Sequence, residues 1–279
     1  LLYVIGEADL VFIAAGMGGG TGTGGSPAVA RLARQQGALT IAVVTRPFTF
    51  EGSRRGSVAR EGIKELQKEV DTLVVVSNDR LLDVVNERVS LDIAFRIADD
   101  VLRQGIQGIS ELITRPGLIN LDFADVRSIL KGAGGALISI GYGEGRNKAE
   151  DAAEMALGSP LLDVKSVHGA EGLLVSLTGG EDLTLAEVDS AMKRISRSTM
   201  PEAEILFGAA IDPQMQDRVQ ITLIAAGLNL DGPARSRAQR EEAAIPFSAS
   251  AIFGDSHPSD EAVPAFMRSA AQAHAGWRS

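Results

Sequence analysis

The sequence predicts a parallel α/β domain, then a mixed α+β domain, then a flexible tail. Short continuous apolar runs, typical of fully buried strands, alternate with helical segments in the first part, which is the pattern of a parallel α/β domain. The pattern changes after residue 133, and regular periodicity ends near residue 228. We therefore place the boundaries at residues 1–133, 134–228 and 229–279.

The first part contains three strand-like runs separated by helical segments. DLVFIAAG, bounded by an acid and a glycine, is typical of a buried strand, and ALTIAVVT and TLVVV are similar. Pro27 suits the first turn of a helix. The connections are long enough for the crossovers that parallel strands require. Strands are therefore predicted at residues 9–16, 38–45 and 72–76, with helices at residues 27–36 and 57–70.

A long helix is predicted at residues 90–113. Its apolar stripe comes from three residues spaced by four, namely Ile93, Ile97 and Val101. Gly105 and Gly108 each weaken its middle by roughly 1 kcal/mol relative to alanine. The Arg-Pro-Gly sequence that follows is a strong stop signal, and a loop then leads into a short helix ending at Leu130.

The second part alternates strands and helices with a different order. Strand-like ALISIGYG precedes a helix at residues 148–157, and strand GLLVSLTG precedes a helix at residues 183–195 with Thr184 as its cap. Two further strands, AEILFGAAI and VQITLIAAG, are joined by an Asp-Pro turn signal. Beyond Asp231 the sequence is rich in Ala, Ser, Arg and Glu without a sustained period, which indicates a flexible tail.

Composition excludes several classes of function. The chain of 279 residues is 45% apolar and 23% charged, which is ordinary for a globular protein. A net charge of −9 argues against a protein that coats nucleic acid or anionic membrane. The absence of cysteine excludes disulfides, zinc–thiolate sites and thiol nucleophiles. No apolar run reaches the ~20 residues that span a bilayer, and the three histidines are too scattered to form a metal site. We expect no nucleic-acid partner, no membrane insertion and no metal bound by side chains alone.

The sharpest local feature is a loop with seven glycines in ten residues, GMGGGTGTGG at residues 16–25, between a predicted strand and helix. Glycine lets backbone N–H groups approach an anion closely, and the N-terminus of the following helix favours negative charge at the same place. Two threonine hydroxyls add donors. The loop therefore predicts a phosphate-binding cradle rather than a merely flexible turn.

Two familiar phosphate loops can be compared with it. A Walker loop ends in Gly-Lys-[Ser/Thr], and no lysine lies near this loop. A dinucleotide fingerprint is formally present at Gly20, Gly22 and Gly25, but it requires an acid about 20 residues further on. No Asp or Glu occurs between Asp9 and Glu51. An NAD(P)-binding oxidoreductase therefore remains the alternative, with weaker support.

The loop and its surroundings resemble a known family. GGGTGTG at residues 18–24 resembles the signature loop of the tubulin/FtsZ family, and the flanking DLVFIAAGM and VVTRPFTFEG resemble its FtsZ branch rather than eukaryotic tubulin. The resemblance continues through NDRLL, the long helix, NLDFADV and the whole second part, over roughly residues 1–228. Members of this family are cytoplasmic GTPases that polymerise head to tail and organise the bacterial division ring at mid-cell.

The resemblance implies a fold and a nucleotide site. The fold would be a tubulin-like, Rossmann-type GTPase domain, here incomplete, joined by a long central helix to a mixed α+β carboxy-terminal domain. The expected cofactors are GTP or GDP with Mg²⁺. The residues implied for the phosphates and sugar are Gly18, Gly19, Gly20, Thr21, Gly22, Thr45, Glu51 and Arg55. From spacing alone, Glu51 and Arg55 could equally be a surface ion pair at i, i + 4.

Three further residues are implied for the guanine base. Asn78 offers a donor and an acceptor, Phe95 an aromatic face for stacking, and Asp99 a carboxylate that accepts from base N–H groups. Phe95 and Asp99 are four residues apart and share one face of the predicted helix. Plain core packing is the local alternative for Phe95.

Two acids are implied for catalysis. Asp122 and Asp125 lie in the NLDFADV sequence, and local spacing alone is also typical of a helix N-cap with an acid in the first turn. In the family this loop enters the nucleotide site of the neighbouring subunit, so the resemblance implies hydrolysis in trans. Because both acids are present, a relative that only co-assembles without hydrolysing GTP is less well supported.

The resemblance also implies that part of the GTPase domain is missing. The chain begins at Leu1 rather than Met, and nothing in it matches the amino-terminal glycine-rich phosphate loop of the family. We therefore expect the chain alone to bind GTP poorly, to be inactive, and to aggregate because a parallel sheet without its inner strands exposes apolar edges.

One segment of the tail resembles a partner-binding peptide. The sequence from Val263 to Arg268, VPAFMR, is similar to the carboxy-terminal peptide through which the family binds membrane tethers and division regulators, although no acid directly precedes the proline. Apolar anchors on a disordered segment suit folding into a groove, and unstructured filler is the alternative.

Overall fold

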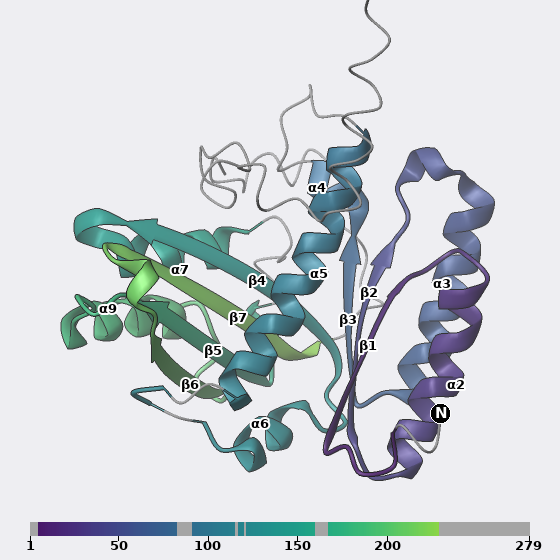
Figure 1. The fold of residues 1–279 in the computed structure, drawn as a ribbon, viewed down its shortest axis with the longest axis horizontal. Coiled ribbons are helices and arrows are strands. Elements are labelled where there is room, and N and C mark those ends of the chain that lie inside the picture. The colour runs from purple at the N-terminus through teal and green to yellow at the C-terminus, as the bar shows by residue number, and fades with distance from the viewer. Residues whose placement is uncertain (1–4, 83–90, 115–116, 120, 160–166, 229–279) are drawn as a thin grey trace, which may run out of the picture.

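A computed structural model describes residues 5–82, 91–114, 117–119, 121–159 and 167–228. The predicted tail peptide at residues 263–268 and Asn120 lie outside these residues. The helices and strands, shown in Figure 1, run in the order β1 (Leu10–Gly16), α2 (Thr21–Gln35), β2 (Leu39–Arg46), α3 (Ser53–Glu69), β3 (Thr72–Ser77), α4 (Asn78–Leu82), α5 (Leu91–Thr114), α6 (Phe123–Leu130), β4 (Gly134–Glu144), α7 (Lys148–Gly158), β5 (Gly172–Gly179), α9 (Leu185–Ser196), β6 (Glu204–Ile211) and β7 (Arg218–Leu228).

The strands form one sheet in the order β1-β2-β3-β4-β7-β5-β6. β1, β2 and β3 are parallel, as the apolar runs predict. A short parallel ladder from Thr72–Val74 to Gly134–Ala136 joins β3 to β4. Beyond it, β7 is antiparallel to both β4 and β5, and β6 is parallel to β5. The second half is therefore the mixed α+β unit that the sequence predicts.

The predicted start of the first helix, at Pro27, is wrong. α2 begins at Thr21, inside the glycine-rich loop. A Cβ atom on Gly22 would lie 2.6 Å from the carbonyl oxygen of Gly16, so a glycine lets this helix end approach the strand. The Ser26 hydroxyl donates to the Gly22 carbonyl at 2.6 Å within the same segment. The low helix propensity of the glycines is thus overridden by tertiary packing.

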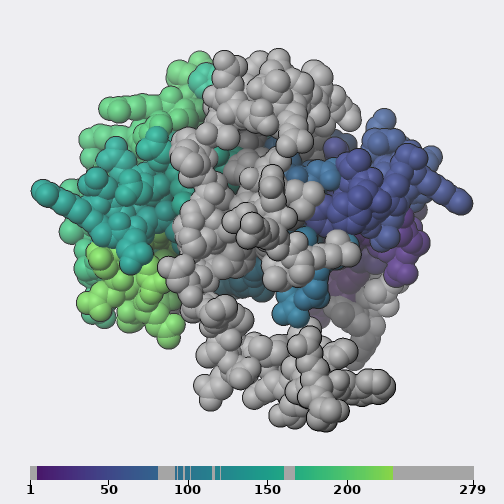
Figure 2. All heavy atoms as spheres, turned by 90° about the horizontal axis from the view of Figure 1, so that it is seen from above, coloured from purple at the N-terminus to yellow at the C-terminus, as the bar shows by residue number. Residues whose placement is uncertain are grey.

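The helices are arranged on both sides of the sheet (Figure 1). α2 and α3 cover one face of β1–β3, and α5 runs between these strands and the carboxy-terminal strands. α7 and α9 pack together and cover the outer face of the carboxy-terminal strands. Seen from above, the first and second halves of the chain lie on opposite sides of the molecule (Figure 2). No helix among the described residues is both long and apolar enough to cross a bilayer.

The two glycines in the middle of α5 have a packing role. A Cβ atom on Gly108 would lie 2.6 Å from the Thr222 methyl carbon on β7, and one on Gly105 would lie 3.1 Å from Ile138 on β4. These glycines let α5 lie close to the carboxy-terminal strands, which offsets their low helix propensity. The central helix is therefore held against the carboxy-terminal strands.

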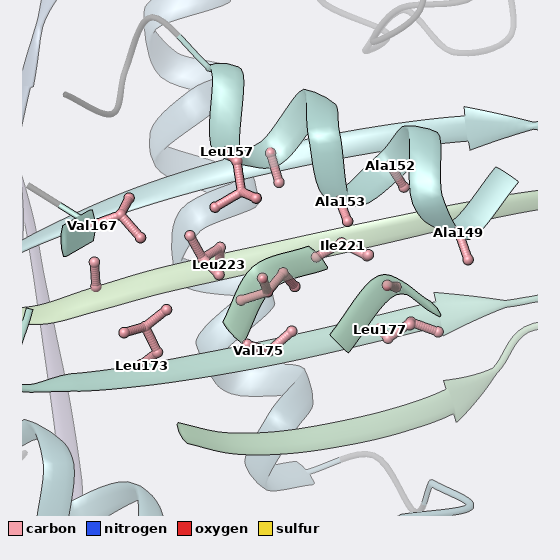
Figure 3. Packing of buried hydrophobic residues seen from close by; sticks show 14 of the residues in the cluster. Ala149, Ala152, Ala153, Leu157, Val167, Leu173, Val175, Leu177, Ile221 and Leu223 are labelled. Carbon is pink, nitrogen blue, oxygen red and sulfur yellow. The ribbon is translucent and has the colours of Figure 1, made fainter. Parts of the chain in front are cut away.

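The core of the second half lies between α7 and the sheet. Figure 3 shows Ala149, Ala152, Ala153 and Leu157 of α7 directed at side chains of β5 and β7. The helix approaches closely because its facing side chains are small and because β4 carries Gly141 beneath it. A Cβ atom on Gly141 would overlap the carbonyl oxygen of Ala152 and lie 2.5 Å from the Ala156 nitrogen.

We expect Gly141→Ala to destabilise the protein by about 3 kcal/mol, because the added atom meets helix backbone rather than a movable side chain. Urea unfolding followed by circular dichroism measures this. Gly56→Ala is the matched control: in α3, its Cβ would meet only the Arg60 guanidinium, at 3.9 Å. That variant should gain roughly 0.5–1 kcal/mol from helix propensity. Equal midpoints for the two variants would contradict the packing of α7 described above.

A buried charge fixes the start of α7. The Lys148 side chain is 4% exposed; its Nζ donates to Asp182 and lies 3.7 Å from Glu187 Oε1. The hydrogen bond between Lys148 and Asp182 raises the pKa of Lys148 and lowers the pKa of Asp182 below its ordinary value of 3.8. A carboxylate with a lowered pKa stabilises the folded state above its ordinary pKa. This contribution is therefore complete at neutral pH and is lost as the pH falls below about 4.

Candidate functional site

The sequence-predicted nucleotide residues gather at one edge of the sheet. β1, β2 and β3 are parallel, so their carboxyl ends meet at that edge, where ligands of parallel sheets bind. The glycine-rich loop follows β1, the turn carrying Glu51 follows β2, and Asn78 follows β3. Thr45, buried near the end of β2, accepts a hydrogen bond from the Met17 N–H through its carbonyl at 2.9 Å.

The glycine-rich loop is shaped by two contacts and is open at its centre. Gly18 has a φ of +104°, and its N–H donates to the Thr23 hydroxyl at 2.8 Å. A Cβ atom on Gly18 would meet Arg55 Cγ at 2.8 Å. By contrast, Cβ atoms on Gly19 and Gly20 would meet nothing within 4 Å. Within the described part of the chain, the space beside Gly19 and Gly20 is therefore open.

The N-terminus of α2 supports the same interpretation. No side chain of the described residues caps this end of the helix, and its first turn, which includes Thr21 and Gly22, contains no acid. Backbone N–H groups at an uncapped helix N-terminus seek an anion or water. The open glycines and the uncapped helix end are features that a phosphate cradle requires, and the cradle itself stays a prediction.

The turn after β2 is a compact hydrogen-bonded unit. The Phe48 N–H donates to Glu51 Oε1 at 2.8 Å, and Glu51 Oε2 lies 3.1 Å from the Arg55 guanidinium. Glu51 and Arg55 are thus the i, i + 4 ion pair that spacing suggests, and Arg55 also lies beside Gly18 of the loop. The pair is placed where it could contact the sugar and phosphate of a nucleotide.

The three residues predicted for the base lie on two neighbouring elements. Asn78 is 5% exposed, and its Oδ1 has no hydrogen-bond partner among the described residues. Phe95 on α5 is 40% exposed, with its ring edge-on to the buried ring of Phe48 at a centroid distance of 5.4 Å. Phe95 is therefore only partly in the core. Asp99 is exposed one turn further along α5.

The two predicted catalytic acids lie away from this edge. Asp122 is the N-cap of α6: its carboxylate accepts from the Ala124 N–H at 3.4 Å, which is the local role expected from spacing. Asp125 is exposed in the first turn of the same helix. α6 lies at the opposite end of α5 from α4 (Figure 1). The helix rises by about 28 Å from Phe95 to its last residue, Thr114. The acids and the base residues of one chain are therefore far apart.

Comparison with known proteins identifies the family. The GTPase-domain profile of the tubulin/FtsZ family matches residues 3–86, and the C-terminal-domain profile of the FtsZ family matches residues 134–229. Among solved structures, the empty FtsZ dimer of M. jannaschii is 41% identical with a TM-score of 0.77. That similarity covers 84% of this chain and 73% of the M. jannaschii chain. The chain belongs to the FtsZ family.

Other solved structures give the same fold. A mutant of the M. jannaschii FtsZ is 44% identical with a TM-score of 0.77, over 81% of this chain and 68% of that one. CetZ1 of Haloferax volcanii, a GDP-bound monomer, is 22% identical with a TM-score of 0.65, over 85% and 68% of the two chains. At that identity the similarity shows the fold alone. The tubulin-like architecture predicted from the sequence is confirmed.

The packing of the glycine-rich loop does not favour the dinucleotide alternative. In a dinucleotide fingerprint the third glycine allows close packing of helix on strand. Here a Cβ atom on Gly25 would meet nothing within 4 Å, whereas the close approach occurs at Gly22. The spacing of the glycines thus matches the dinucleotide fingerprint, but Gly25 does not have the packing role of its third glycine.

Sequence reasoning missed three residues that line or support this candidate site. Phe48 supports Phe95, Phe50 stacks on Phe48 at 4.9 Å, and Asp79 accepts two hydrogen bonds from Thr49. The aromatic pair could have been noticed from the two phenylalanines beside Glu51. The Asp79 contact joins residues 30 positions apart, and no local pattern indicates it.

Proposed function

We propose that the protein binds GTP at the edge formed by β1–β3 and polymerises head to tail, so that each subunit completes the GTPase site of the next. Membership of the tubulin/FtsZ GTPase family supports the nucleotide. One observation supports the shared site: the base residues and the acids lie at opposite ends of α5, so a single chain cannot bring them together.

Each end of the protein has a distinct task in this proposal. The uncapped N-terminus of α2 and the open glycines bind the phosphates, and Asn78 Oδ1 gains the hydrogen-bond donor that it lacks. Asp122 and Asp125 of the neighbouring copy position and polarise the attacking water beside the γ-phosphate. Removing one of these acids should therefore abolish GTP turnover without preventing nucleotide binding.

Mg²⁺ is proposed to arrive with the nucleotide. No group of three or more His, Cys, Asp or Glu side chains within the described residues could hold a metal ion. Mg²⁺ commonly binds substrate phosphates with few protein ligands, so it does not require a carboxylate cluster on the protein. When bound, it would neutralise phosphate charge during phosphoryl transfer.

Self-assembly and a role in division are proposed from relatives. The FtsZ of M. jannaschii has been solved as a dimer and CetZ2 of Haloferax volcanii as a GTPγS-bound protofilament. A cytoplasmic filament at the mid-cell division ring, with tethers and regulators bound at residues 263–268, is consistent with this family. A heterologous head-to-tail contact generates such open filaments.

Nucleotide selectivity tests the proposal against the oxidoreductase alternative. The natural protein carrying this sequence should be protected from thermal unfolding by GDP and GTP, and not by NADH. At a nucleotide concentration 100 times the Kd, protection should be about 2.7 kcal/mol. Differential scanning fluorimetry with each ligand measures it. Protection by NADH without protection by GDP would contradict the proposal and support the alternative.

A further inference from the structure

Asp79 joins the start of α4 to the turn after β2 through both oxygens of its carboxylate. It directly follows Asn78 at the end of β3, and the residue it holds, Thr49, lies in the turn after β2. Oδ1 accepts from the Thr49 N–H at 2.9 Å, and Oδ2 accepts from the Thr49 hydroxyl at 2.6 Å. Hydrogen bonds to an ionised acceptor are stronger than neutral ones. The carboxylate therefore fixes one residue of the neighbouring loop in position and orientation.

The turn that Asp79 holds organises other parts of the site. Thr49 lies between Phe48, whose ring supports Phe95, and Phe50, which stacks on Phe48. The same turn places Glu51, which pairs with Arg55 beside the glycine-rich loop. One carboxylate thus connects the start of α4, where Asn78 lies, to the turn that supports the stacking ring and places the Glu51–Arg55 pair.

We propose that Asp79 is a positioning residue for guanine recognition, a role that rests on the proposed nucleotide site. It sets the spacing between Asn78 and Phe95 by holding the turn beneath the phenylalanine ring. Without this link, the turn is released from β3, and Phe95 loses a fixed support. The site then retains its phosphate cradle but binds guanine with lower affinity and selectivity.

A purely local role would have different consequences. Asp79 also lies in the first turn of α4, where a carboxylate is favoured by the helix dipole. That role does not involve Thr49, and losing it would change the stability of α4 without changing the choice of base. The distinguishing measurements are therefore the protection of the Thr49 amide and the preference between bases.

Four variants separate these roles. Asp79→Ala removes both hydrogen bonds, and Thr49→Val removes only the one from the hydroxyl. Asp79→Asn is the conservative rescue, because its oxygen can accept from the Thr49 N–H while its amide donates to the hydroxyl. Glu65→Ala is the control for lost charge, since Glu65 pairs with Lys68 in an exposed position on α3, away from Asn78 and Phe95.

Two readouts are used on the natural protein carrying this sequence. Hydrogen exchange without nucleotide should show that the Thr49 amide loses protection in Asp79→Ala and keeps it in Asp79→Asn. Calorimetric titration with GDP and IDP, which lacks the exocyclic amine, should show GDP affinity falling by about tenfold in Asp79→Ala. The preference for GDP over IDP should shrink with it. Thr49→Val should be intermediate, and Glu65→Ala should match the wild type.

The outcomes are distinct. Unchanged Thr49 protection and base preference in Asp79→Ala would overturn the positioning role while leaving the nucleotide site intact. A loss of affinity equal for GDP and IDP, without rescue in Asp79→Asn, would also overturn it, because the residue would then act only on the fold. A wild-type protein that binds no guanine nucleotide would overturn the proposed function itself.

Discussion

Gly20→Val is expected to abolish nucleotide binding while leaving the nucleotide-free fold intact. Gly20 has a φ of −76°, which valine can adopt, and a Cβ atom there would meet nothing within 4 Å. The added side chain therefore costs the empty protein little. It occupies the space in which a phosphate would meet the N-terminus of α2, so affinity for GDP should fall by about a hundredfold or more. Titration of the natural protein carrying this sequence with a fluorescent GDP analogue measures this.

Gly25→Ala provides the control in the same segment. Its Cβ atom would also meet nothing within 4 Å, but it lies further along α2, past the N-terminus of the helix. That variant should bind GDP like the wild type and be more stable by roughly 0.5–1 kcal/mol, because alanine favours a helix interior. A Gly20→Val variant with wild-type affinity would show that phosphates do not bind at this loop.

Asp125→Ala is expected to stop GTP hydrolysis while preserving both nucleotide binding and assembly. The variant leaves every residue predicted to contact the nucleotide unchanged. The rate should fall by about a hundredfold or more, as for removal of a group that positions or activates the nucleophile. Phosphate release, measured together with sedimentation of polymers, tests it. An Asp125→Ala protein that polymerises and hydrolyses GTP at the normal rate would exclude Asp125 from catalysis.

Asp125 is a cleaner probe than Asp122. Asp122 caps α6, so its loss should also destabilise the helix by about 1 kcal/mol. The structure gives the Asp125 carboxylate no such cap: the hydrogen bond to Asp122 uses the Asp125 main-chain N–H, which alanine retains. Glu65→Ala on α3 again controls for the change in net charge. A selective loss of turnover in Asp125→Ala is therefore attributable to the missing carboxylate.

Much of the first half was predictable because burial alone shapes its strands. β2 is buried along almost its whole length, and such a strand needs a continuous apolar run. Parallel pairing then places the residues that follow β1, β2 and β3 at one edge, so the site could be located from chain order. The start of α2 could not be predicted, because glycines have low helix propensity and the close approach of Gly22 to Gly16 is visible only in the packed structure.

The separation of the base residues from the acids follows from the predicted long helix, because Phe95 lies near the start of α5 and Asp122 and Asp125 come after its end. The contact between Asp79 and Thr49, by contrast, could not be predicted, because packing brings the two residues together and no periodicity connects them. Capping, by contrast, is visible locally: Thr184 and Glu187 form the reciprocal hydrogen bonds of a capping box, as the sequence predicts for Thr184.

Mixing the two inactive variants tests the shared site most directly. Gly20→Val lacks the phosphate cradle but carries Asp125, whereas Asp125→Ala lacks the acid but binds GTP. In an equal mixture that co-assembles at random, up to about a quarter of head-to-tail contacts would pair an intact cradle with an intact acid. GTP hydrolysis should therefore return on mixing to about that fraction of the wild-type rate. If the two variants co-sediment in one polymer and hydrolysis stays absent, the site is not shared between subunits.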